Sequence, residues 1–174
     1  MKTNLALIGF MGVGKSAAGR ALAEELKKRF VETDAVIKKK AGKSISRIFE
    51  EEGEIAFREM EIEAIKEIAP GKDQVIACGG GVVLNKINID RLRKEALIVW
   101  LTASPGEVRK RLLRDQEARP LLKGRNNLAE IRRMMTDRKP YYESADDIKV
   151  DTSRLDVDSV VGQGTRVVIR VQMS

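Results

Sequence analysis

The segment GFMGVGKS, residues 9–16, constrains the fold of this chain more than any other feature of its sequence. It follows the apolar run LALI and precedes a stretch of helical periodicity, which is the context of the motif G-x-x-x-x-G-K-[ST]. Its glycines let the backbone bend around an anion with N–H groups pointing inward, and the following helix dipole adds attraction. The motif therefore predicts a nucleotide-phosphate site rather than an ordinary glycine-rich turn.

The lysine and the serine of this loop have separate predicted roles. Lys15 can reach the β- and γ-phosphates, and the hydroxyl of Ser16 can ligate Mg²⁺. The remaining nucleotide contacts are expected from the loop backbone and the residue after it, namely Gly12, Val13, Gly14 and Ala17.

The bulk composition narrows the class of protein. The chain has 174 residues, of which 43% are hydrophobic and 34% charged, as expected for one globular domain. No apolar run approaches the ~20 residues that cross a bilayer, and the N-terminal apolar run is interpreted as a first strand rather than a signal peptide. Cys78 is the only cysteine, so no internal disulfide can form, which favours a cytoplasmic location.

Charge and missing residue types exclude further functions. The chain has no histidine, which removes the commonest general base and any imidazole metal ligand. Its net charge is +7, but aromatic residues make up only 4% and do not interleave with cations as in single-strand binders. We therefore expect a small anionic substrate, and neither a nucleic-acid nor a membrane partner.

Short apolar runs alternate with segments of helical periodicity, which predicts an α/β fold. Helices are expected to start at the N-cap candidates Ser44 and Ser104. The expected strands cover residues 5–9, 30–31, 74–77, 96–101 and 147–150. The expected helices cover residues 15–29, 44–51, 53 to about 69, a segment from 104, and 127 to about 142. This order predicts a three-layer α/β/α architecture around a central, mostly parallel five-stranded sheet.

The strand over residues 75–77 ends in Cys-Gly-Gly-Gly and lacks the acidic residue that usually holds Mg²⁺ in motors and switches. A small phosphotransferase instead needs an acceptor pocket and a cover that excludes water. Residues 115–127 lose their periodicity and carry Arg119, Lys123 and Arg125. They fit such a cover, although an ordinary solvated basic loop would have the same composition.

These motifs, in this order, resemble the shikimate kinase family of the nucleoside-monophosphate-kinase-like group. The resemblance covers about residues 5–154. It rests on GFMGVGKS, on ETD ending in Asp34, on AGKSISRIFEEEGEIAFRE with Arg58, on GGG, on ARPLL with Arg119, and on DRKPYYESAD with Arg138. One motif alone would be weak evidence, but six in order are specific.

The resemblance implies a P-loop kinase fold and an ATP- and Mg²⁺-dependent phosphorylation of the 3-hydroxyl of shikimate, within aromatic amino-acid biosynthesis (the chorismate pathway). Asp34 matches the residue that hydrogen-bonds the ring hydroxyls and can accept the proton of the attacking one. Arg58 and Arg138 match the arginines that bind the carboxylate, for which a guanidinium fork is well suited.

Simpler interpretations of these residues stay open at the level of sequence. Asp34 could be the N-cap of a helix over residues 35–41. Arg58 could form a surface salt bridge with Glu54 or Glu61, and Arg138 could do the same elsewhere on its helix.

The resemblance also assigns the remaining site residues. Arg119 matches the arginine of the family's lid, where it would contact the nucleotide and stabilise the transferring phosphoryl group. Arg111, Arg114 or Arg154 could stack on adenine. Backbone N–H groups of three consecutive glycines at a strand end could approach the acceptor closely: Gly79, Gly80 and Gly81.

The chain departs from the family pattern near the metal and at its end. Glu32, expected at the metal together with Ser16, stands where the family usually has Asp. Ala77 occupies a position where a small polar residue is common, and Ala17 replaces a second hydroxyl residue. The tail, residues 161–174, contains two glycines followed by VVIRVQMS, which predicts a turn and a strand instead of the family's final helix.

We therefore expect one domain over residues 1–174, with an acceptor-binding segment over about 32–62 and a lid over about 112–126. The protein is expected to be a monomer. Two alternatives remain: a related kinase acting on another small anion such as gluconate or a nucleoside monophosphate, and a nucleotide-binding regulator with weak catalysis.

Overall fold

The protein is built around one parallel β-sheet. The computed structural model describes residues 2–114, 127–154, 156, 158–163 and 165. The strands are β1 (Asn4–Ile8), β2 (Arg29–Glu32), β3 (Gln74–Ala77), β4 (Ala96–Thr102) and β5 (Ile148–Asp151). Their spatial order is β2-β3-β1-β4-β5, and all four pairings are parallel. The predicted five-stranded α/β sheet is confirmed.

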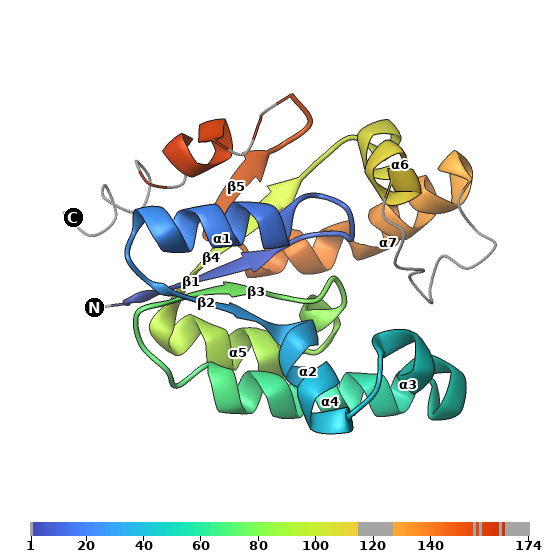
Figure 1. Cartoon of the computed structure of the whole chain (residues 1–174). Helices are drawn as coiled ribbons and strands as arrows, with labels where there is room; N and C mark the ends of the chain where they lie inside the picture. Colours follow the sequence, from blue (N-terminus) through green and yellow to red (C-terminus); the bar gives the residue numbers. More distant parts are fainter. Residues whose placement is uncertain (1, 115–126, 155, 157, 164, 166–174) are drawn as a thin grey trace.

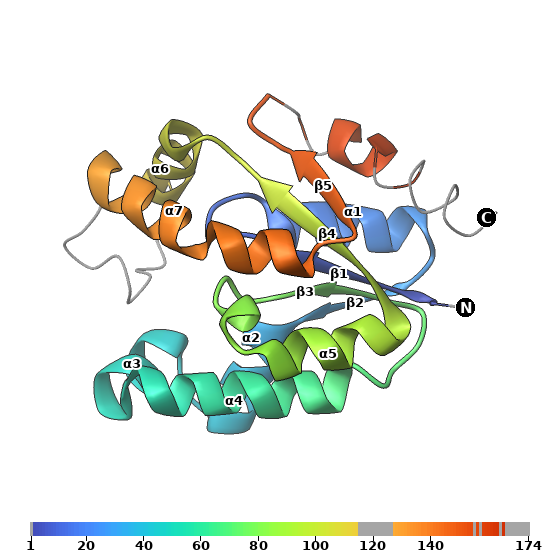
Figure 2. The same cartoon turned by 180° about the vertical axis from the view of Figure 1, so that it is seen from behind.

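Helices cover both faces of this sheet. They are α1 (Lys15–Glu25), α2 (Thr33–Ala41), α3 (Ile45–Glu51), α4 (Gly53–Ile68), α5 (Lys86–Glu95), α6 (Pro105–Arg114) and α7 (Leu128–Ala145), with a 3₁₀ turn η1 (Val82–Leu84). In Figure 1, α1 lies in front of the sheet, and Figure 2 shows α5 and α7 in front of its other face. This is the predicted three-layer arrangement.

The strand residues alternate between two cores. Leu5 and Leu7 of β1 pack in the cluster that contains the apolar side of α1, whereas Ala6 and Ile8 pack with α4 and α5. All of them are buried because both faces of the sheet are covered. This double burial explains why the strands are continuous apolar runs and not alternating patterns.

Several local signals act as the sequence predicts. The hydroxyl of Ser44 accepts a hydrogen bond from the N–H of Arg47 at 3.2 Å, and the hydroxyl of Ser104 accepts one from the N–H of Glu107 at 3.3 Å. Gly53 separates α3 from α4 with a φ of +84°. These caps fix where the helices begin.

Two boundaries differ from the prediction. The first helix ends at Glu25, not at residue 29, because Lys27 adopts a left-handed φ of +53° and Arg29 already pairs in β2. The predicted lid over residues 112–126 begins too early, since residues 112–114 form the last turn of α6. The rest of that segment, residues 115–126, lies outside the described residues.

The turn predicted over residues 161–166 is wrong where the structure describes it, and the strand predicted after this turn falls on residues outside the described ones. Residues 158–163 and Thr165 are helical. The carboxylate of Asp156 accepts a hydrogen bond from the N–H of Ser159 at 2.8 Å, and Val160 is buried in the core beside α1. A cap and a buried apolar contact thus outweigh the low helix propensity of glycine and valine. Residues 166–174 lie outside the described residues.

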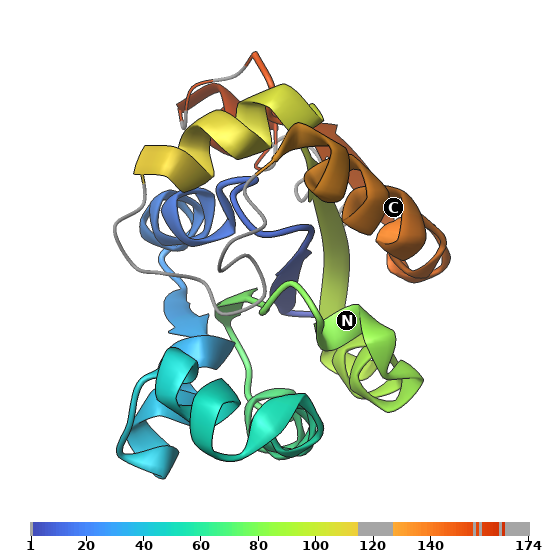
Figure 3. The ribbon, with the colours of Figure 1, turned by 90° about the vertical axis from the view of Figure 1, so that its right-hand side faces the viewer.

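The carboxyl ends of the strands meet at one edge of the sheet, which faces the viewer in Figure 3. The loop after β1, the start of α2 after β2 and the glycines after β3 all lie at this edge. Ligands of open α/β sheets bind at such an edge. Among the described helices, none is long and apolar enough to cross a membrane.

Candidate active site

The phosphate loop joins β1 to α1. Gly14, the N-cap of α1, has a left-handed φ of +96° and provides no side-chain cap to the first turn. The first N–H groups of α1 therefore point toward the loop interior, where an anion can accept them. The ammonium of Lys15 donates to the carbonyl oxygens of Gly9 and Phe10, at 2.7 and 2.8 Å.

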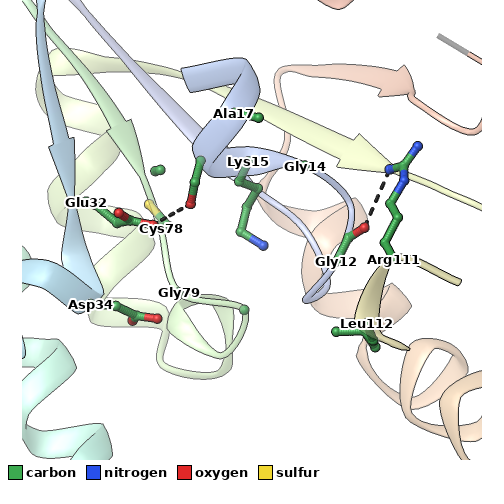
Figure 4. A pocket seen from close by; sticks show the side chains of 13 residues that line it. Gly12, Gly14, Lys15, Ala17, Glu32, Asp34, Cys78, Gly79, Arg111 and Leu112 are labelled. Carbon is green, nitrogen blue, oxygen red and sulfur yellow. Dashed lines mark hydrogen bonds between the residues drawn. The ribbon is translucent and has the colours of Figure 1, made fainter. Parts of the chain in front are cut away.

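A cavity of about 270 Å³ lies between this loop and the neighbouring strand ends. Figure 4 shows Lys15 projecting into it, with Asp34 and Gly79 on one side and Arg111 and Leu112 on the other. Its lining consists of Gly12, Gly14, Lys15, Ser16, Ala17, Glu32, Asp34, Ala77, Cys78, Gly79, Gly80, Arg111 and Leu112. The cavity therefore brings the phosphate loop and the predicted metal residues together with three of the predicted acceptor residues, Asp34, Gly79 and Gly80, while Arg58, Gly81 and Arg138 lie outside its lining.

The two predicted metal residues contact each other. The hydroxyl of Ser16 donates to a carboxylate oxygen of Glu32, and a guanidinium nitrogen of Arg20 lies 3.7 Å from the second oxygen. Within the described part of the chain, no group of three or more His, Cys, Asp and Glu side chains could hold a metal by itself. This set of donors fits Mg²⁺, which takes one or two protein oxygens and completes its shell with phosphate oxygens and water.

Arg111 ties the phosphate loop to the end of the sheet. Its guanidinium donates to the carbonyl oxygens of Val13 at 3.2 Å and Thr152 at 2.9 Å. The hydroxyl of Thr152 also donates to Val13, at 2.9 Å. Of the three arginines considered for adenine, Arg111 thus borders the cavity, while Arg114 and Arg154 are exposed outside its lining.

The loop after β3 is crowded by acidic side chains at Gly79. A Cβ atom at this position would lie 2.8 Å from both Asp34 Oδ1 and Glu61 Oε1. The N–H of Gly79 donates to the hydroxyl of Thr33 at 2.8 Å, and Thr33 is fully buried. Only glycine leaves room here for the two carboxylates.

Asp34 lies in the first turn of α2, which begins at Thr33. The alternative interpretation of Asp34 as a helix N-cap is therefore wrong, because the N-cap position belongs to Glu32. The carboxylate of Asp34 instead lines the cavity.

Arg58 forms both ion pairs that the sequence allows. Its guanidinium nitrogens lie 2.6 Å from Glu61 Oε2 and 2.9 Å from Glu54 Oε1. The pair is not a plain surface salt bridge, however, because the Arg58 side chain is only 13% exposed. A Cβ atom on Gly81 would collide with its guanidinium, so the arginine reaches the glycine loop.

Glu61 is a functional candidate that sequence reasoning considered only as a salt-bridge partner. It is fully buried, and its Oε1 atom has no hydrogen-bond partner among the described residues. The pKa of Glu61 is raised to about 7, mainly by burial and also by the nearby Asp34, while Arg58 and Arg138 oppose the shift. The spacing of three residues from Arg58 on one helix was the available signal.

Arg138 reaches the same glycine loop from α7. It is 8% exposed, and its guanidinium donates to the carbonyl oxygen of Gly80 at 3.3 Å. Its Cζ atom lies 5.7 Å from the centre of the Phe10 ring. Tyr142, one turn later, donates to the same carbonyl at 2.7 Å, and burial raises the pKa of Tyr142 to about 12.

The structure thus gathers most of the predicted residues at one sheet edge. Asp34, Arg58 and Arg138 converge on the glycine loop of residues 79–81 from α2, α4 and α7. Arg119 lies outside the described residues. A phosphate-binding loop next to a glycine loop on which two arginines and a carboxylate converge defines a P-loop kinase of a small anionic acceptor.

Comparison with known proteins identifies the family. The family model described as shikimate kinase matches residues 11–168. A shikimate kinase of Thermodesulfovibrio yellowstonii is 45% identical over 157 residues, which cover 90% of each chain. That of Symbiobacterium thermophilum is 40% identical over 162 residues, covering 92% of each. The chain belongs to the shikimate kinase family, and the reaction it catalyses is the phosphorylation of shikimate.

Comparison with solved structures supports the same family. The shikimate kinase of Acinetobacter baumannii in complex with shikimate superimposes with a TM-score of 0.94 at 30% identity, over 100% of this chain and 97% of that one. A gluconokinase from Sinorhizobium meliloti 1021 reaches a TM-score of 0.63 at 18% identity, over 97% of this chain and 93% of that one, which is a likeness of fold alone. Neither the alternative acceptors nor a regulator with weak catalysis is favoured.

Proposed function

We propose that the protein transfers the γ-phosphoryl group of ATP to the 3-hydroxyl of shikimate, with Mg²⁺ as the cofactor. The observation that carries this proposal is the convergence of Asp34, Arg58 and Arg138 on one loop beside the cavity that Lys15 enters. This convergence supports an anion site and a carboxylate within reach of the nucleotide phosphates. In-line transfer depends mainly on such positioning.

On the donor side, the backbone of residues 12–17 would hold the phosphates at the N-terminus of α1. Lys15 would leave the carbonyls of Gly9 and Phe10 and bind the β- and γ-phosphate oxygens. Ser16 and Glu32 would hold Mg²⁺, which when bound neutralises charge on the phosphates. Binding of the ion would replace the Ser16–Glu32 hydrogen bond.

On the acceptor side, Arg58 and Arg138 would bind the carboxylate of shikimate as a pair of charge-assisted contacts. Asp34 would orient the ring hydroxyls and accept the proton of the attacking one, a role that a chain without histidine leaves to a carboxylate. The N–H groups of Gly79, Gly80 and Gly81 would line the approach to the acceptor.

The remaining roles rest on the resemblance to the family. Arg119 would stabilise the transferring phosphoryl group, and Arg154 would contact the nucleotide from the segment that Thr152 ties to the phosphate loop. We further propose one domain over residues 1–174, a monomeric state and a cytoplasmic location, with residues 32–62 as the acceptor-binding segment.

The decisive experiment is ADP release measured by a coupled assay with ATP and Mg²⁺, with and without shikimate. We expect shikimate-dependent release and a product phosphorylated at the 3-hydroxyl by NMR. Gluconate and nucleoside monophosphates should not replace shikimate. ADP release that does not depend on shikimate, or that Arg58→Ala leaves unchanged, contradicts the proposal.

A further inference from the structure

A second pocket opens beside the acceptor site, between α7 and the carboxyl ends of β4 and β5. Its volume is about 210 Å³. The residues that line it are Phe10, Val13, Trp100, Leu101, Thr102, Pro105, Arg132, Met135, Thr136, Lys139, Tyr142 and Lys149. It shares no lining residue with the nucleotide cavity. Of the described residues assigned above to the nucleotide or the acceptor, only Val13 lines it, and Val13 is assigned through its backbone.

The chemistry of the lining has two parts. Its inner surface is apolar and aromatic, with Phe10, Trp100 and Tyr142 each less than a tenth exposed. Three cations, Arg132, Lys139 and Lys149, also line it, whereas none of its lining residues is acidic. A pocket of this size suits a single ring, and its charge favours an anionic substituent on that ring.

Two of the cations are held in place by neighbouring residues. Lys149 stands opposite Trp100 in the pairing of β4 with β5, and its ammonium lies 4.4 Å from the centre of the indole ring. The ammonium of Lys139 lies 3.5 Å from a carboxylate oxygen of Glu143, one turn along α7 and outside the lining. The cations therefore remain beside the apolar surface rather than extending at random into solvent.

The wall between this pocket and the acceptor site is one side chain thick. Tyr142 stacks on Trp100 with ring centroids 5.6 Å apart, and its hydroxyl donates to Gly80. Phe10 lies under the guanidinium of Arg138. The same two aromatic residues thus support the acceptor loop on one side and line the second pocket on the other.

We propose that this pocket is a second ligand site, which binds a small aromatic carboxylate. The ring occupies the apolar surface along Trp100, and the carboxylate interacts with the ammonium and guanidinium groups of Lys149, Lys139 and Arg132. The site is distinct from the acceptor site, where Arg58 and Arg138 bind a carboxylate on a non-aromatic ring. The claim does not depend on the identity of the phosphorylated substrate.

Trp100 offers a direct test because it is the only tryptophan of the chain. Its fluorescence is measured during titration of the full-length protein with phenylacetate, with 2-phenylethanol as the uncharged analogue and acetate as the analogue without a ring. We expect a saturable change with phenylacetate and at least ~10-fold weaker binding of both analogues, since each lacks one half of the recognition. If 2-phenylethanol binds as tightly as phenylacetate, the proposed preference for an anionic ligand is wrong.

Substitutions locate the binding. Lys149→Met and Arg132→Met should each weaken phenylacetate binding by about threefold or more, as for loss of one partly exposed charge pair. The matched control is Lys86→Met, which removes an 83% exposed lysine on α5 and should change nothing. Calorimetry measures the same affinities independently, because Lys149 contacts the reporting indole ring.

Two further variants distinguish binding of the probe in the second pocket from binding in the acceptor site. Thr136→Phe fills the second pocket and should abolish phenylacetate binding while shikimate phosphorylation persists, which also shows that the variant folds. Arg58→Met should leave phenylacetate binding unchanged, and saturating shikimate should not displace the probe. Displacement by shikimate, or loss of binding in Arg58→Met but not in Lys149→Met, would assign the probe to the acceptor site. If phenylacetate does not bind to the full-length protein at all, the proposal is wrong.

Discussion

The donor half and the acceptor half of the active site are built in different ways. The donor half comes mainly from one contiguous segment, residues 9–17, whose strand, loop and helix follow directly in the chain, and Glu32 at the end of β2 joins it through Ser16. The acceptor half comes from α2, α4, the loop after β3, and α7, so that Asp34 and Arg138 are far apart in sequence. Local backbone geometry creates the first, whereas tertiary packing creates the second.

The two halves also differ in the interactions that hold their residues in place. The phosphate loop presents backbone N–H groups and one lysine, and no buried charge pair is needed to hold it. The acceptor half places Glu61 in the core and compensates its burial with Arg58. Such a pair depends on every partner being present, because a lone buried charge is strongly unfavourable. Substitutions in the donor half should therefore change mainly the rate of phosphoryl transfer. Substitutions in the acceptor half should change both the affinity for the acceptor and the stability of the fold.

The largest effect is expected in the donor half. Lys15→Met should lower kcat by about 10³-fold, because it removes the charge next to the transferring phosphoryl group. The free energy of unfolding should change little, since the hydrogen bonds from Lys15 to the carbonyl oxygens of Gly9 and Phe10 are local to the loop. Coupled ADP release and urea denaturation measure the two quantities. A large decrease in the free energy of unfolding of Lys15→Met would contradict the prediction, because it would show that the fold of the loop depends on Lys15.

A smaller effect is expected for the acceptor arginines. Arg138→Ala should raise the KM for shikimate about 100-fold and leave the KM for ATP nearly unchanged, because one charge-assisted contact to the carboxylate is lost. Steady-state kinetics with each substrate varied in turn test this split. Arg133→Ala, on the same helix, is the matched control, since Arg133 pairs with Glu130 at 3.0 Å away from the site. Equal rises in both KM values would contradict the division into two halves.

A third prediction concerns the glycine loop. Gly79→Ala should raise the KM for shikimate by about tenfold, because the new methyl group would meet Asp34 and Glu61 at 2.8 Å and displace them by a few tenths of an ångström. Gly106→Ala is the control, because nothing lies within 4 Å of a Cβ atom there. The experiment is again steady-state kinetics. An unchanged KM in Gly79→Ala would mean that the carboxylates are less tightly held than the structure indicates.

A fourth prediction, on stability rather than kinetics, is a pH dependence of the free energy of unfolding. The pKa of Glu61 rises from 4.5 to about 7 on folding, so the folded state binds more protons between these values. The contribution of Glu61 to the free energy of unfolding is therefore greatest below pH 4.5 and falls as the pH rises toward 7, by at most ~1.4 kcal/mol per pH unit.

Urea denaturation of the wild type and of Glu61→Gln at several pH values isolates this term. The difference in unfolding free energy, wild type minus variant, should fall across the window and flatten above pH 7. Glu63→Gln, an exposed glutamate on the same helix, serves as the control. A difference that rises with pH would mean that Arg58 lowers the pKa more than burial raises it.

The sequence predicted the fold well where local signals were strong. The strand at Gln74–Ala77 and the N-caps at Ser44 and Ser104 lie where expected, because apolar runs and capping hydroxyls act over a few residues. The turn predicted from residue 161 was wrong because residues 158–163 are helical and Val160 is buried with the apolar residues of α1, a contact that no local pattern reveals. Helix α5 was not anticipated at all.

The candidate site shows the same contrast between local sequence signals and tertiary contacts. Asp34, Arg58 and Arg138 were found through motif order, but spacing alone could not separate them from caps and surface salt bridges. The contacts of the loop Gly79–Gly81 favour a shared acceptor site, since side chains from α2, α4 and α7 meet there. Glu61 and Tyr142 were missed as site residues because their importance comes from burial beside that loop.

By itself, the sequence determined a nucleotide-phosphate loop at the end of a buried strand, because the conformation of residues 9–16 follows from their own glycines and the adjoining helix. Only the tertiary structure decided which charges converge on the loop Gly79–Gly81, how Glu61 is buried, and that Tyr142 lines a second, cationic pocket. These features depend on contacts between residues distant in the chain. Burial and charge pairing arise when the sheet and its helices pack, not before.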